Sequence, residues 1–367
     1  MNHGPVSAPA GTPTPSGQPL DVGLALNVWT DARPDLGERD GRRRYSELLD
    51  EARLADTLPF HAFCTTEQHG VDDGYLPQQL TLIAGLAGAT SRIRFMTSAL
   101  LLPLHPLRMV VEQAIVADLV SGGRLALGLA AGGFRREFDL FGVDMSTRGQ
   151  TMEHGIPKVR RGLTEGRLPD GPDGCLVPVL PRPAQERIPI YLGGLAQRVI
   201  DRAVRLADGV LPYDFIRPDE SFPQFWREKL KPALDRHGRT LDDFRFIFHT
   251  NLWAAEDPER DFEQIIRPAM EYQQTKFATW GGAELEPGYA TSGDLRVRGN
   301  LLVDTPENLA RRILDIRARC PFQELTFWYR IPGISHEQSL GHLELVASQL
   351  IPRLRPAEES AANGANA

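Results

Sequence analysis

Acid, amide and imidazole side chains follow the second apolar run of the chain, and this is the first place where chemistry can be located. Glu67, Gln68 and His69 follow the run HAFC at 61–64 after two threonines. An imidazole titrates near neutral pH, so His69 is a candidate general acid or base. A histidine that only hydrogen-bonds its own loop is the alternative. His105 follows the next run but precedes a proline, which favours a structural role.

Eight short apolar runs alternate with segments of helical periodicity, and this pattern must position the candidate residues. Buried parallel strands read as such runs, and alternation with helices implies an all-parallel sheet. No dinucleotide fingerprint follows the first run, so we predict a (β/α)8 TIM barrel with insertions, whose reactive residues lie at the carboxyl ends of the strands. The predicted strands are 21–29, 61–64, 92–103, 124–132, 188–194, 209–213, 244–253 and 324–330.

Composition limits the domain organisation. Residues 1–19 are rich in Pro, Gly, Ser and Thr, and 356–367 are of similar character, so we expect a disordered arm and a disordered tail. The stretch between them, 20–355, is expected to be one barrel. Residues 277–300 form an irregular, glycine-containing stretch. Loops of that length commonly act as lids, and we predict a lid insertion there.

Charge and cysteine content argue against several classes of protein. The formal net charge is −7, which disfavours nucleic-acid binding. No apolar run is long enough to cross a bilayer, so no membrane association is expected. The cysteines are Cys64, Cys175 and Cys320. Their number is odd and their spacing fits no metal motif, so we expect no metal site and a cytoplasmic location.

A glycine pair ends the fifth predicted strand. Gly193 and Gly194 precede a helix that starts near Ala196. Glycine lets backbone amides approach an anion closely, and a helix N-terminus favours negative charge. The sequence therefore allows a phosphate site here, although an ordinary tight turn between strand and helix has the same composition.

A long ordered set of motifs resembles the bacterial luciferase-like flavin monooxygenase family. The set runs from LLLP and HPLR, through SGGR and LGLAAG, to EFDLFGVD and a following Arg, with TEQHG before it and IPIYLGG after it. The resemblance covers roughly 20–353. It implies a flavin whose ring lies along the third and fourth strands, with a non-proline cis peptide near Ser98–Ala99, and whose phosphate lies after the fifth. The expected flavin-contacting residues are Ser98, Ala99, Ala130, Ala131, Gly193, Gly194, Leu195, Ala196 and Gln197.

Three departures from the family pattern concern the same site. Gln68 stands where the family has a catalytic His, so the resemblance passes the proton role to His69, beside Glu67. Ala130 and Ala131 replace the Cys-Arg pair that bacterial luciferase carries beside the flavin phosphate. The helix after Gly194 also lacks that protein's Glu-Ser pair. Among the expected catalytic residues, His69 is therefore the remaining candidate for a general acid or base.

The resemblance implies a monooxygenase that uses reduced FMN and O2 to oxygenate a small organic substrate. A separate flavin reductase and a homodimer are expected. An F420-dependent oxidoreductase that transfers hydride, and a barrel that only binds a ligand, remain alternatives. A hydrolase using Glu67 and Asp214 has no support from their context. Side chains at strand ends suggest an apolar or aromatic substrate pocket, with barrel core as the alternative for the aromatic ones: Trp29, Phe63, Tyr213, Asp214 and Trp328.

Overall fold

The computed structural model describes most of the chain, in six segments. Several predictions fall outside them: the disordered arm 1–19, the disordered tail 356–367, and the pocket residues Trp29, Tyr213 and Asp214. The residues described are 20–26, 41–169, 174–212, 218–280, 301–330 and 332–354.

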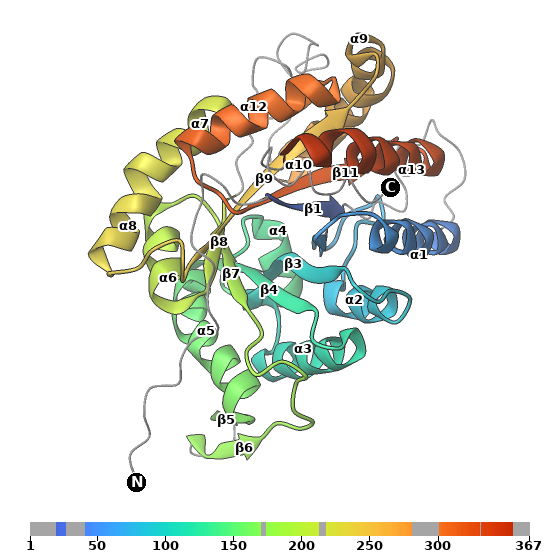
Figure 1. The fold of residues 1–367 in the computed structure, drawn as a ribbon. Coiled ribbons are helices and arrows are strands. Elements are labelled where there is room, and N and C mark those ends of the chain that lie inside the picture. Colours follow the sequence, from blue (N-terminus) through green and yellow to red (C-terminus); the bar gives the residue numbers. More distant parts are fainter. Residues whose placement is uncertain are drawn as a thin grey trace, which may run out of the picture.

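Eight parallel strands form a closed ring, as predicted for a TIM barrel (Figure 1). Each strand pairs with the next one around the ring, and the β8–β9 and β11–β1 pairings close it. All eight predicted strands are present, most of them shorter than predicted. Their bounds are β1 Asp21–Leu26, β2 Ala62–Thr65, β3 Arg94–Leu101, β4 Leu125–Ala130, β7 Ile190–Gly193, β8 Gly209–Leu211, β9 Arg245–Ala254 and β11 Glu324–Arg330.

Helices cover the outside of the ring (Figure 1). Their inner faces carry the buried apolar residues, as expected for amphipathic helices packed on a sheet. The α-helices are α1 Gly41–Thr57, α2 Gln79–Ala87, α3 Leu107–Ser121, α4 Arg135–Phe141, α5 Arg148–Glu165, α6 Gln197–Leu206, α7 Pro218–Phe225, α8 Lys231–Arg236, α9 Pro258–Asp261, α10 Arg267–Trp280, α12 Pro306–Arg319 and α13 His336–Leu345. Short 3₁₀ and π segments are η2 Leu102–Leu104, η3 Met145–Thr147, η5 Trp226–Leu230, η6 Phe262–Ile266, η7 Val346–Leu350 and η8 Ile351–Leu354. None of the described helices has the length and hydropathy needed to cross a membrane.

The core has two layers, and Phe63 lies in the outer one. Its ring contacts Phe95 and Tyr329, with centroids 6.4 and 6.0 Å away, between the strands and the helices. The flanking Ala62 and Cys64 belong instead to the cluster inside the barrel. Side chains alternate along a strand, so Phe63 points away from the barrel axis. The prediction that Phe63 lines a substrate pocket is therefore wrong.

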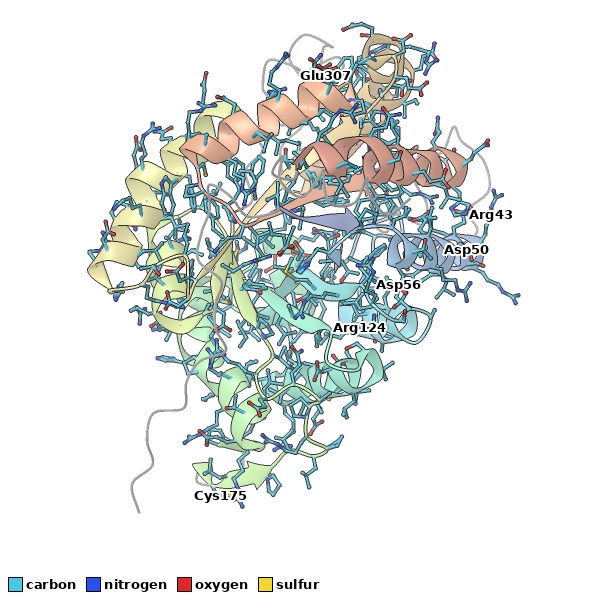
Figure 2. All side chains as sticks on the ribbon, in the orientation of Figure 1. Arg43, Asp50, Asp56, Arg124, Cys175 and Glu307 are labelled. Carbon is cyan, nitrogen blue, oxygen red and sulfur yellow. The ribbon has the colours of Figure 1, made fainter. Side chains whose placement is uncertain are left out.

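Three elements differ from the predicted organisation. A strand of four residues, β10 Leu301–Asp304, pairs in parallel with the end of β9, outside the eight-strand ring. A small antiparallel hairpin of β5 Arg167–Pro169 and β6 Leu176–Pro178 stands at the periphery, where Figure 2 labels the exposed Cys175. The first four residues of the predicted lid insertion, 277–280, are the last turn of α10. The rest of that insertion, 281–300, lies outside the described residues.

Strand β3 carries the irregularity that the resemblance implied. The Ser98–Ala99 peptide is cis, and the register between β3 and β4 shifts between Thr97 and Leu100. At this point the β3 backbone lies close against Gly128 of β4. A Cβ atom on Gly128 would lie 2.1 Å from the Thr97 carbonyl oxygen, so only glycine fits.

Candidate active site

A cavity of about 650 Å³ opens at the carboxyl ends of the barrel strands. Residues at the ends of β2, β3, β4, β7, β8 and β11 line it, as the barrel fold requires of an active site. Most of the expected flavin-contacting residues line this cavity; Gln197 does not, and its side-chain amide bonds Asp201 instead. The lining members of that set are Ser98, Ala99, Ala130, Ala131, Gly193, Gly194, Leu195 and Ala196.

Small residues form one wall of the cavity. A Cβ atom on Gly193 would lie 3.7 Å from the Cβ atoms of both Ala99 and Ala130, so these three residues are neighbours on adjacent strands. Small side chains here leave room for a flat ring to approach the backbone. Because Ala130 and Ala131 are small and uncharged, they leave room for a ring where the Cys-Arg pair of bacterial luciferase would place a charged side chain.

The N-terminus of α6 closes one end of the cavity. Its N-cap residue, Ala196, makes no side-chain cap, so the first amides of the helix remain available to an anion. Gly194 precedes it with φ +137°, a conformation that favours glycine. This end therefore has the backbone features that a phosphate requires.

Three arginines lie at the same end and supply positive charge. Arg148, Arg198 and Arg202 all line the cavity. Arg202 is held by Glu153 at 2.9 Å and by the Gly149 carbonyl at 3.2 Å. Arg198 forms no ion pair within the described part of the chain. Arg148 is the Arg that follows EFDLFGVD in the family motif, whereas no motif in the sequence pointed to Arg202.

Ser98 offers a further polar atom to the cavity. Its residue is 5% exposed, and its Oγ atom has no hydrogen-bond partner among the described residues. A buried hydroxyl without a partner loses its hydration at a cost of roughly 1–3 kcal/mol. A bound polar ligand would recover that cost, so the cavity is suited to a ring that carries hydrogen-bonding atoms.

The opposite wall comes from the loop after β2. Glu67 and Gln68 both line the cavity, whereas His69 does not. Gln68 is held in place by a hydrogen bond from its backbone amide to the Leu76 carbonyl. His69 lies behind Glu67, and its Nε2 atom is 2.8 Å from Glu67 Oε1. The expected general acid or base therefore reaches the cavity only through its neighbour.

Burial and hydrogen bonding compete at Glu67. Burial alone would raise the pKa of this carboxyl, but hydrogen bonds from His105 and His69 outweigh it and hold the pKa below its ordinary value. Glu137 accepts a hydrogen bond from the His69 backbone amide at 3.0 Å. Burial nevertheless raises the pKa of Glu137 to about 7. The site thus holds an ionised carboxylate beside one that is half protonated near neutral pH.

Aromatic residues line the remainder of the cavity. Trp328, expected in the substrate pocket, is one of them. Tyr75 and Phe277 also line it, and both contact Trp280, with ring centroids 5.9 and 5.2 Å away. These last two residues were missed because Tyr75 stands in a loop without a motif and Phe277 stands in the stretch that was expected to be irregular.

The chain belongs to the luciferase-like monooxygenase family, because the family's profile matches residues 25–321. One relative, the 4-hydroxyprotoasukamycin monooxygenase of Streptomyces nodosus subsp. asukaensis, is 27% identical over 273 residues, which cover 70% of this chain and 72% of that protein. Another is the oxygenase component of the flavin-dependent trigonelline monooxygenase of Acinetobacter baylyi. It is 30% identical over 122 residues, which are 32% of this chain and only 34% of that protein.

Solved structures agree with this assignment. Monooxygenase RslO1 from Streptomyces bottropensis superposes with a TM-score of 0.76 at 25% identity, covering 91% of this chain and 99% of that one. The coenzyme F420-dependent tetrahydromethanopterin reductase of Methanopyrus kandleri shares the fold, with a TM-score of 0.68 at 16% identity, covering 92% of this chain and 100% of that one. The family therefore establishes an oxidoreductase barrel, and its fold is shared by proteins that use different cofactors.

Proposed function

We propose that this protein is a monooxygenase that uses reduced FMN and O2 to oxygenate a small organic substrate. The observation that carries the proposal is the cavity itself, which joins an anion site at the α6 N-terminus to a buried carboxylate at Glu67. A phosphate monoester carries nearly two negative charges at neutral pH. Three arginines beside an uncapped helix suit that charge.

Each part of the cavity has a role in this proposal. Backbone amides around Gly193 to Gln197, with Arg198, would hold the phosphate, and Ser98, Ala99, Ala130 and Ala131 would support the ring. The reduced flavin supplies the electrons that activate O2. The aromatic wall excludes water and suits an apolar or aromatic substrate, with Trp328 beside it.

Partners follow from the same proposal. Since no second nucleotide-binding fold is recognisable in the sequence, a separate reductase would supply the reduced flavin, and that supply favours a cytoplasmic location. The trigonelline enzyme named above is likewise an oxygenase component. A homodimer is supported by an exposed apolar stripe on α3, where Met109, Val116, Leu119 and Val120 are 42–49% exposed. Sedimentation analysis of the purified protein tests the dimer.

Cofactor choice is tested by titrating the purified protein with FMN, reduced FMN and F420, and then following O2 uptake. We expect the tightest binding for reduced FMN, with O2 consumption that depends on it. Incorporation of one ¹⁸O atom from ¹⁸O₂ into an aromatic probe substrate would identify the monooxygenase reaction. Preferential binding of F420 without O2 uptake would instead favour hydride transfer, and binding without turnover of any cofactor would favour a ligand-binding barrel.

A further inference from the structure

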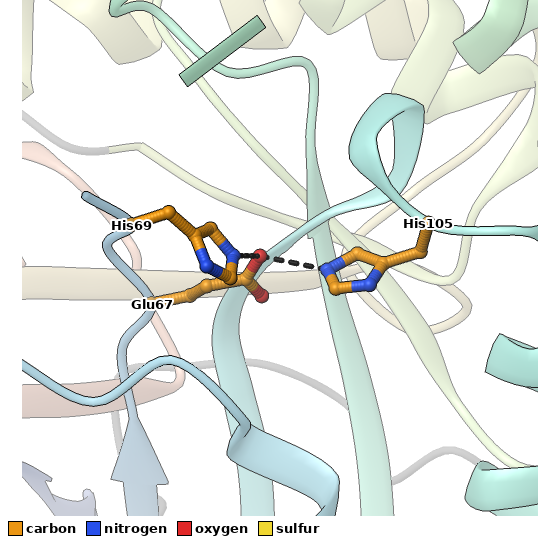
Figure 3. A group of neighbouring side chains, drawn as sticks. All are labelled: Glu67, His69 and His105. Atoms are coloured by element: carbon orange, nitrogen blue, oxygen red, sulfur yellow. Dashed lines mark hydrogen bonds and ion pairs between the residues drawn. The ribbon is translucent and has the colours of Figure 1, made fainter. Parts of the chain in front are cut away.

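Two histidines share one carboxylate oxygen behind the cavity wall. His69 Nε2 and His105 Nε2 lie 2.8 and 2.7 Å from Glu67 Oε1, and Figure 3 shows Glu67 between the two imidazoles. His105 follows η2, 38 positions after Glu67 in the chain. The side chain of Glu67 is 1% exposed, so this is a buried cluster, which we call the Glu67 cluster.

Two histidines and a glutamate are also a common ligand set for divalent metals, but the distances argue for hydrogen bonds. Ligand atoms that surround a zinc ion at about 2.0–2.1 Å in a tetrahedron lie about 3.3 Å from one another. Here both nitrogen–oxygen distances fall in the range of charge-assisted hydrogen bonds. The three side chains therefore hold protons between them.

Glu67 is the member of the cluster that reaches the cavity. It is the single carboxylate among the described residues that line the cavity, and no described histidine lines it. The phenol of Tyr75 also lines it, but burial raises the pKa of this phenol well above its ordinary range, so it does not ionise at neutral pH. Proton exchange between the described wall and a bound molecule therefore passes through Glu67.

Gln79 fixes the orientation of this carboxylate relative to β3. Its Nε2 atom donates to Glu67 Oε2 at 3.0 Å, while its Oε1 atom accepts from the Ser98 backbone amide at 3.2 Å. One amide side chain thus links the carboxylate to the strand on which the flavin is proposed to lie. Both oxygens of Glu67 are held, and its position relative to that strand is set by the protein.

The environment of the two histidines differs. Phe141 packs edge-on against His69 with ring centroids 4.7 Å apart, and more distantly against His105 at 6.4 Å. The side chain of His69 is 7% exposed and that of His105 is 13% exposed. His105 is therefore the member closer to solvent, and His69 is the member sealed behind Phe141.

We propose that the Glu67 cluster is a proton relay in which His105 exchanges protons with solvent and Glu67 exchanges them with the molecule bound in the cavity. In one direction, the Nε2–H bond of the His105 imidazolium breaks and an O–H bond forms on Glu67. Glu67 then passes that proton to a basic atom in the cavity, and solvent reprotonates His105. No electrons move in these steps. His105 and His69 are positioning residues that act through Glu67; the basic atom belongs to the cofactor or substrate, so the proposal rests on the proposed function.

Other ionisable groups face the cluster and bear on its pH dependence. Glu137 of α4 meets the His69 backbone amide, and Asp73 and Tyr75 lie in the loop that leads to α2. Burial raises the pKa of Asp73 to about 6 and that of Glu137 to about 7. A pH profile of the cluster must therefore be compared with that of a Glu137→Gln variant.

The first experiment needs no cofactor. Nitrogen-15 NMR of the histidine side chains follows the Nε2 signals of His69 and His105 in the purified protein and in Glu67→Gln. We expect both Nε2 atoms to show the signal of a nitrogen hydrogen-bonded to a carboxylate in the wild type, and both signals to move in the variant. Unchanged Nε2 signals would overturn the relay. So would stoichiometric binding of Zn²⁺ that displaces both signals, which would identify a metal site instead.

The second experiment measures turnover. His105→Gln keeps a hydrogen-bond donor but cannot ionise, so we expect kcat to fall about 10- to 100-fold, its pH profile to change, and the affinity for FMN to stay within about twofold. His61→Gln is the matched control, because His61 also faces two carboxylates, Asp21 and Glu324, but at the other end of the barrel. A wild-type pH profile in His105→Gln would overturn the relay. If the wild-type protein does not turn over reduced FMN, the proposed function fails, and the NMR experiment still tests the cluster.

Discussion

Polar side chains cluster at both ends of the barrel, but the two ends differ in how far these side chains are paired with one another. At the amino ends of the strands a cavity of about 210 Å³ is lined by Asp21, His61, Arg245 and Glu324. Arg245 donates to both Asp21 and Glu324, the latter at 3.2 Å. Burial would lower the pKa of Arg245, but these two carboxylates outweigh it and raise the pKa. The charges at this end compensate one another.

At the carboxyl ends of the strands, several polar groups have no partner among the described residues and are available to a ligand. The Ser98 hydroxyl has no partner, α6 has no side-chain cap, and Arg198 has no ion pair in the described residues. A paired group contributes to the stability of the fold, whereas an unpaired buried group costs free energy until a ligand binds. The comparison therefore separates residues that maintain the barrel from residues that serve its ligand.

The largest effect is expected at His69, on the ligand end. His69→Ala removes one of the two hydrogen bonds to Glu67 Oε1, so we expect turnover to fall by about two to four orders of magnitude, while flavin affinity changes little. His237→Ala, on an exposed histidine after α8, is the control. Steady-state O2 uptake measures both variants. Near wild-type turnover in His69→Ala would remove this residue from the mechanism.

A smaller effect is expected at Gly194. A side chain there is strained by φ +137° and would lie 3.2 Å from Val199, beside the uncapped end of α6. We expect Gly194→Leu to weaken FMN binding by about 100-fold, with the circular dichroism spectrum preserved. Gly133→Ala, also in the cavity wall but with open space around it, should bind FMN normally. Equal affinities for the two variants would place the phosphate elsewhere.

A substitution at the amino ends of the strands should lower the free energy of unfolding and leave FMN binding unchanged. Arg245→Met leaves Asp21 and Glu324 without their shared partner. We expect the free energy of unfolding to fall by about 2 kcal/mol, because a buried carboxylate loses its compensating charge. Urea denaturation measures this loss, and FMN titration serves as the control. A change in FMN affinity larger than the change in stability would contradict the separation between the two ends.

The smallest effect is expected at Glu137. Its pKa in the folded protein is about 7, above the ordinary value of 4.5, so the folded state binds the proton more tightly and stability is lost as pH rises from about 4.5 to 7. Glu137→Gln cannot ionise and should be more stable than the wild type at pH 8, and equally stable near pH 4. Urea denaturation at the two pH values checks this. A destabilised variant at pH 8 would show that the carboxylate is well compensated.

The eight ring strands could be predicted because each is buried on both faces and reads as an apolar run. The same property hides the direction of each side chain, which is why Phe63 was assigned to the pocket although it packs against Phe95 and Tyr329. Strand β10 has only four residues and follows the irregular stretch 277–300, so its run did not stand out.

The candidate site could be predicted in part. Glu67, Ser98 and the glycine pair at 193–194 occupy strand ends, and strand ends of a barrel converge. The contact between His105 and Glu67 joins residues 38 positions apart, and its partner depends on how η2 turns after β3. No local pattern encodes such a contact, so His105 was assigned a structural role. The contact between His105 and Glu67 is seen only in the three-dimensional structure.

Strand β9 is ten residues long and has three partners. Residues 245–246 pair with β8, residues 247–251 pair with β11, and the last four residues pair with β10. The chain between Trp280 and Leu301 is therefore attached to a strand that belongs to none of the eight ring pairings. For protein engineering this is a convenient insertion point. Segments of different length exchanged there would leave the register of every ring pairing unchanged, because β10 takes part in none of them.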